Sequence, residues 1–93
     1  MIPLELDDYF VYVLQNESNK RWHAGCTNNL RKRLQQHQGD KSGYTKHRGP
    51  YKLIDYEVSF NENDARAREK YLKTGMGKRY LRNRLKRSLT LTG

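Results

Sequence analysis

The stretch that decides the fold is YFVYVLQNESNKRWHAGCTNNLRKRLQQH, residues 9–37. Its first run, residues 9–14, is rich in β-branched and aromatic side chains and is apolar on both faces, which predicts an interior strand. Its second run, residues 21–26, alternates apolar with polar positions and predicts another strand. The polar break over residues 15–20 is typical of a hairpin loop, so the two strands are expected to be neighbours.

The segment after this hairpin predicts an amphipathic helix with a charge in an unusual place. Leu30 and Leu34 are four residues apart and share the buried face, and Arg33 and His37 fall on the same stripe. A guanidinium directed toward a core is costly unless it meets a partner or an anion. We therefore expect a specific reason for Arg33, and anionic phosphate is an obvious candidate.

Capping residues and glycines mark the boundaries around this helix. Thr27 or Asn28 is placed to cap it, and Asn29 also serves its start. Beyond the helix, residues 39–50 read GDKSGYTKHRGP, a polar, glycine-rich segment that predicts a long loop. Long loops in small domains are often functional.

The rest of the chain predicts one strand and two helices. Asn61 is placed to cap a helix, with Asp64 near its positive end, and Gly75 and Gly77 are expected to end that helix. The expected elements are a strand over residues 52–58, a helix over 62–73 and a basic helix from 78 to about 89. No repeat or linker divides the chain. The sequence thus predicts one α+β domain over residues 1–93, in the order β-β-α-β-α-α.

The charge of the chain favours nucleic acid as its partner. Nineteen Lys and Arg against ten Asp and Glu give a net charge of +9 over 93 residues, and no acidic residue follows Glu69. A surface of one sign concentrates polyanions and steers their approach. The alternative is a basic protein that is merely soluble.

Cysteine content and hydropathy restrict the other classes. A lone cysteine, Cys26, excludes an internal disulfide and fits a reducing, cytoplasmic setting. No apolar run approaches the roughly 18 residues that span a bilayer, and the acidic start MIPLELDD is unlike a signal peptide, so we expect no membrane association. His23, Cys26, His37 and His47 match no ordinary zinc module.

The second predicted helix also directs a charge inward. Ala65, Glu69 and Leu72 stand at positions i, i+4 and i+7, so Glu69 projects from the apolar face. Two interpretations follow from the periodicity. Arg33 and Glu69 form a buried, structural ion pair, or each holds a separate part of one reaction centre.

Four segments in order resemble the GIY-YIG nuclease superfamily, in particular its small single-domain bacterial members. FVY at residues 10–12 stands at the GIY position and HAG at residues 23–25 at the YIG position, followed by TNNLRKRL and ARAREKYLK. Arg33 matches the helix arginine of the family and Glu69 its metal-binding glutamate. The resemblance covers residues 9–85, nearly the whole chain.

The resemblance implies a three-stranded antiparallel sheet flanked by helices and a metal-dependent DNA endonuclease that hydrolyses phosphodiester bonds with an activated water. Glu69 would bind one Mg²⁺ or Mn²⁺, since a hard cation that keeps most of its waters needs a single carboxylate. Arg33 would neutralise charge on the scissile phosphate. No small-molecule cofactor is implied.

His23 departs from the family pattern, because a tyrosine normally stands there. Tyrosine has a pKa of about 10 and histidine of about 6.5, so histidine is the more available base at neutral pH. His23 would then accept the proton of the attacking water while Tyr12 orients it. The alternatives are a tolerated ring on a partly exposed strand, or an inactive descendant that only binds nucleic acid.

Several further residues are candidates for substrate binding. His37 either contacts phosphate or packs, and Asn83 is placed to reach the site from the last helix. Tyr44, Lys46 and Arg48 in the predicted loop suit a DNA backbone and an unstacked base, and a solvated loop is the alternative. Because phosphate contacts supply most of the affinity, structure-selective or weakly sequence-selective cleavage is expected.

Overall fold

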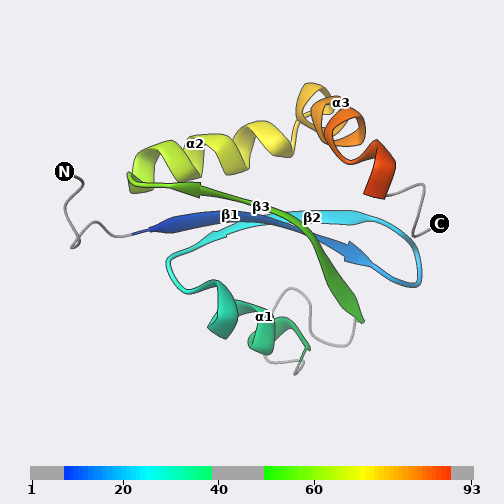
Figure 1. The fold of residues 1–93 in the computed structure, drawn as a ribbon, viewed down its shortest axis with the longest axis horizontal. Helices are drawn as coiled ribbons and strands as arrows, with labels where there is room; N and C mark the ends of the chain where they lie inside the picture. Colours follow the sequence, from blue (N-terminus) through cyan, green and yellow to red (C-terminus); the bar gives the residue numbers. More distant parts are fainter. Residues whose placement is uncertain (1–7, 39–49, 89–93) are drawn as a thin grey trace.

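The computed structural model describes residues 8–38 and 50–88, with the backbone alone at 37 and 38. It is an α+β fold, and the predicted order β-β-α-β-α-α is confirmed (Figure 1). The elements are β1 (Tyr9–Asn16), β2 (Trp22–Thr27), α1 (Leu30–Gln38), β3 (Tyr51–Ser59), α2 (Glu62–Leu72) and α3 (Gly75–Arg84).

The three strands form one antiparallel sheet in the order β2-β1-β3. The prediction of an interior strand is confirmed, because β1 is central and four of its successive side chains, Val11 to Leu14, are at most 1% exposed. Both faces of the sheet are therefore covered. β2 and β3 are its two edges.

Helices cover the two faces unequally, with α2 and α3 on one side and α1 on the other (Figure 1). Under α2 and α3, one core cluster consists of Val11, Val13, Ala24, Ala65, Leu72, Leu81 and Leu85. On the opposite face, Leu30 and Leu34 of α1 pack against Tyr12 and Leu14, as their spacing predicts. Alternate residues of β1 thus belong to different cores.

The start of α1 differs from one of the two capping predictions. Asn29, expected to serve the helix start, is the cap, because its Oδ1 accepts a hydrogen bond from the amide of Lys32 at 3.1 Å. Thr27 acts one step earlier, accepting from the Asn29 amide at 3.1 Å. Neither Thr27 nor Asn28 is the cap itself.

The predicted boundary between the last two helices is wrong. Asn61 caps α2 as expected, accepting from the amides of Asn63 and Asp64, but Gly75 and Gly77 lie in the first turn of α3 rather than ending α2. Thr74 caps α3 by accepting from the Gly77 amide at 3.1 Å. The hydroxyl of Thr74, directly before Gly75, thus starts a helix there.

Candidate active site

Tyr12 brings a hydroxyl from the centre of the sheet toward its β2 edge. In the β1–β2 register Tyr12 faces Gly25, and a Cβ atom at Gly25 would collide with Oη and Cζ of Tyr12. The ring therefore lies across the backbone of β2 at the only kind of residue that leaves room for it. This contact explains the glycine of HAG in steric terms.

Arg33 meets this hydroxyl from the α1 side. The half-buried guanidinium forms a hydrogen bond with Tyr12, and its charge lowers the pKa of the phenol, but burial outweighs both effects and raises that pKa above 10.0. The charge of Glu69 raises it further. Tyr12 is consequently protonated at neutral pH.

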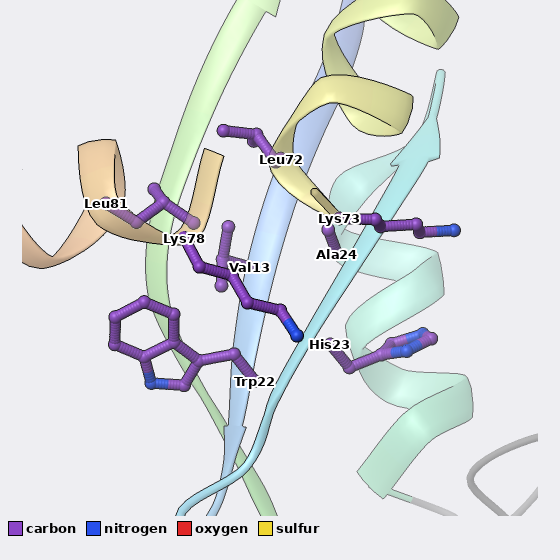
Figure 2. Close-up of a pocket in the computed structure, with 8 residues that line it drawn as sticks. All are labelled: Val13, Trp22, His23, Ala24, Leu72, Lys73, Lys78 and Leu81. Atoms are coloured by element: carbon purple, nitrogen blue, oxygen red, sulfur yellow. The ribbon is translucent and has the colours of Figure 1, made fainter. Parts of the chain in front are cut away.

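His23 lies on the edge strand β2, half-buried. Burial lowers the pKa of its imidazole below 6.5, the charge of Lys73 lowers it further, and Glu69 opposes both effects. The imidazole is therefore neutral at neutral pH. Figure 2 shows that the rings of His23 and Trp22 extend in opposite directions from β2.

Glu69 reaches the same edge from the α2 side. Its side chain is 22% exposed and its Oε2 lies 2.9 Å from Nζ of Lys73. The carboxylate acts electrostatically on Tyr12, His23 and Cys26, which places it near all three. Tyr12 and His23 of the sheet, Arg33 of the α1 layer and Glu69 of the α2 layer thus gather at one edge.

The structural ion pair considered for Arg33 and Glu69 is not formed within the described part of the chain. Arg33 instead forms a hydrogen bond with Tyr12, and Glu69 instead pairs with Lys73. The two inward charges approach the sheet from opposite faces. The other interpretation, in which each holds a separate part of one reaction centre, stays a prediction.

The residues at this edge fit a hard divalent cation that needs one carboxylate. Glu69 is partly exposed and already accommodates one cationic group, the ammonium of Lys73. Residues 8–38 and 50–88 contain no group of three or more His, Cys, Asp or Glu side chains able to hold a metal ion. Mg²⁺ and Mn²⁺, which retain waters, suit such a site better than zinc, which favours several protein ligands.

Not every predicted site residue is brought to this edge. Asn83 is exposed on α3. The side chain of His37 lies outside the described residues, as do Tyr44, Lys46 and Arg48. Their proposed contacts with substrate stay predictions.

Sequence reasoning missed a cavity beside these residues. It has a volume of about 420 Å³ and lies between β2, the end of α2 and α3, with Trp22, His23, Lys73 and Lys78 among its lining residues (Figure 2). The sequence predicts Trp22 only as an apolar position of a strand, and Lys78 only as a basic position of a helix. Nothing in their spacing pairs β2 with α3.

In the part of the chain that the structure describes, no helix is long and apolar enough to cross a membrane.

Comparison with known proteins places this geometry in a family. The model of the GIY-YIG catalytic domain matches residues 8–86. A UPF0213 protein of Clostridium perfringens is 40% identical over 65 residues, covering 69% of each chain. The UPF0213 protein YazA of Bacillus subtilis is 38% identical over 71 residues, covering 75% of this chain and 71% of its own.

A solved structure supports the same relationship. The solution NMR structure of a UPF0213 protein from Bacillus halodurans is 26% identical, with a TM-score of 0.51 over 80% of this chain and 81% of that one. Sequence and fold therefore agree over most of the chain. It belongs to the GIY-YIG catalytic domain family, a family of nucleases, and is similar to the bacterial UPF0213 proteins within it.

Proposed function

We propose that this protein is a metal-dependent DNA endonuclease that hydrolyses phosphodiester bonds with an activated water. The observation that carries the proposal is the convergence of Tyr12, His23, Arg33 and Glu69 at the β2 edge, from the sheet and from both helical layers. A purely structural core does not need two inward-directed charges that have separate partners. A reaction centre uses such charges for separate tasks.

Arg33 is proposed to neutralise charge that develops on the scissile phosphate. Its hydrogen bond with Tyr12 orients the guanidinium, and its position on the first turn of α1 keeps it half-buried. A guanidinium stays charged at every relevant pH and presents a planar set of donors. A preoriented donor of this kind stabilises a transition state without further rearrangement.

His23 is proposed to accept the proton of the attacking water, and Tyr12 to orient that water. At neutral pH the His23 imidazole is neutral and basic, whereas burial keeps Tyr12 protonated. A protonated phenol donates a hydrogen bond but does not accept a proton. His23, at the YIG position, is therefore the proposed general base.

Glu69 is proposed to hold one Mg²⁺ or Mn²⁺. When bound, the cation would supply positive charge beside the phosphate. Lys73 keeps the carboxylate at the edge of the sheet through their 2.9 Å contact.

The basic C-terminal part of the domain is proposed to bind the DNA backbone. Lys78, Arg79 and Arg82 of α3 are exposed, and no acidic residue follows Glu69 in the sequence. Phosphate contacts supply affinity but little sequence information. Cleavage that selects DNA structure, with weak sequence preference, follows from such contacts.

Incubation with branched, flapped and plain duplex DNA tests the proposal. We expect products with Mg²⁺ or Mn²⁺, none with chelator, and a preference among the three substrates. The replacement of the family tyrosine by His23 favours one second candidate, a nucleic-acid-binding module without activity. Binding to all three substrates without any metal-dependent product would identify that module and contradict an endonuclease.

A further inference from the structure

The cavity beside the candidate active site combines three kinds of surface. Its floor is apolar and includes Leu72 and Leu81, Trp22 supplies an aromatic wall, and Lys78 supplies positive charge, whereas the ammonium of Lys73 is paired with Glu69. None of the described residues that line it is acidic. Its volume of about 420 Å³ lies within the range of small-ligand sites.

We propose that this cavity receives one unstacked base of the nucleic-acid substrate, adjacent to the phosphate at the β2 edge. An aromatic ring beside an apolar floor suits the flat face of any base, and the ammonium of Lys78 suits a flanking phosphate. In Figure 2 the Lys78 side chain extends from α3 toward β2. Lys78 thus spans the space between α3 and the edge strand, beside Trp22.

The cavity adjoins the candidate active site at two residues. His23 lines it from β2, with its ring extending away from Trp22 (Figure 2), and Lys73 lines it while contacting Glu69 at 2.9 Å. A base held here therefore belongs to a nucleotide close to the phosphate that Arg33 and Glu69 would address. The inference rests on the proposed function and narrows its substrate class.

That class is nucleic acid with an unpaired nucleotide beside the cleaved bond. A base paired inside a duplex must be extruded before it reaches the cavity, and the cost of extrusion is least for mismatched or single-stranded bases. Flaps, branches and single strands present such bases. Plain duplex does not.

Trp22 is the single tryptophan of the chain, so its fluorescence reports on the cavity. The experiment titrates the wild-type protein, in chelator, with an oligothymidylate and with an abasic oligomer of the same length and phosphate number. We expect the oligothymidylate to quench Trp22 and to bind at least about fivefold more tightly, the contribution of one base–aromatic stack. Equal quenching and affinity for the two oligomers would overturn the proposal.

Lys78→Gln provides the second arm, with Lys70→Gln as its matched control. Both lysines are exposed, and both changes remove one positive charge, but only Lys78 lines the cavity. We expect Lys78→Gln to weaken oligothymidylate binding severalfold more than Lys70→Gln. Equal effects would contradict a phosphate contact at the cavity.

These measurements are separate from the test of cleavage. Chelator removes catalysis, so base binding is scored whether or not the protein is a nuclease. Quenching that depends on the base, in a protein without metal-dependent products, would support the cavity and reject the endonuclease. Products without base-dependent quenching would do the reverse.

Discussion

At the scale of single residues, the site depends on one close approach between β1 and β2. Tyr12 lies over Gly25, and its hydroxyl meets Arg33. Position 25 therefore determines where the phenol and, through it, the guanidinium are held. A side chain there acts on the site without touching substrate.

Gly25→Ala is expected to abolish most cleavage, because the added methyl collides with Oη and Cζ of Tyr12 and displaces the ring from Arg33. Overpacking of this kind also costs about 1–3 kcal/mol of stability. Cleavage rate and thermal unfolding measure the two effects. Gly75→Ala is the control, since a Cβ there meets nothing within 4 Å. A Gly25→Ala variant as active as the control would refute the steric role.

His23 is expected to set the acid limb of the pH profile. Its pKa lies below 6.5. As the pH falls through this pKa, the imidazole gains a proton and ceases to act as a base. Cleavage should then decline with falling pH, and His23→Phe should reduce the rate by about 10²–10⁴-fold and remove this limb. Initial rates across a pH series check it. An unchanged rate or profile in His23→Phe would exclude the base.

At the scale of elements, the close packing of α2 on α3 depends on Gly77. A Cβ at this position would collide with the backbone of Tyr71 and Leu72 at the end of α2. This contact sets the distance between α2, which carries Glu69, and α3, which carries Lys78. The packing of the two helices therefore determines where these two side chains lie.

Gly77→Ala is expected to destabilise the domain by at least about 1 kcal/mol, since backbone atoms rather than a flexible side chain obstruct the methyl. Chemical unfolding of Gly77→Ala and Gly75→Ala measures the difference. Both replace a glycine in the first turn of α3, so helix propensity largely cancels. Equal stability of the two variants would show that the helices separate at no cost.

The sequence predicts elements better than it predicts contacts between them. The apolar faces of β1 identify the central strand, and the cap at Asn61 identifies the start of α2, because both signals are local. The sequence predicts a helix end at Gly75 and Gly77, which is wrong because the reason for Gly77 is a contact with another helix. Periodicity cannot supply that contact.

The same limit applies to the site. Arg33 and Glu69 stand out because a charge on a buried face conflicts with helical periodicity, and the family resemblance relates them to Tyr12 and His23. The i, i+4 spacing of Glu69 and Lys73 is itself a signal for an ion pair on a helix, but the inward direction predicted for Glu69 drew attention away from it. The hydrogen bond between Arg33 and Tyr12, by contrast, joins residues of different elements and is shown only by the fold.

At the scale of the whole molecule, the two helical layers bring opposite charges to one edge of the sheet. Arg33 comes from the α1 layer and Glu69 from the α2 layer, and their charges cancel. The net charge of +9 therefore lies on the rest of the chain. Binding and chemistry are therefore separable. Many basic residues share the attraction for DNA, whereas one carboxylate is proposed to hold the metal.

The most direct test of the account is cleavage by wild type and Glu69→Gln, measured in Mg²⁺ alongside DNA binding in chelator. Glutamine keeps the shape of the side chain and removes its charge. We predict a loss of cleavage of at least about 100-fold, the scale of a lost electrostatic contribution to the transition state, with binding preserved or slightly stronger. A Glu69→Gln variant that cleaves like wild type would contradict the central claim.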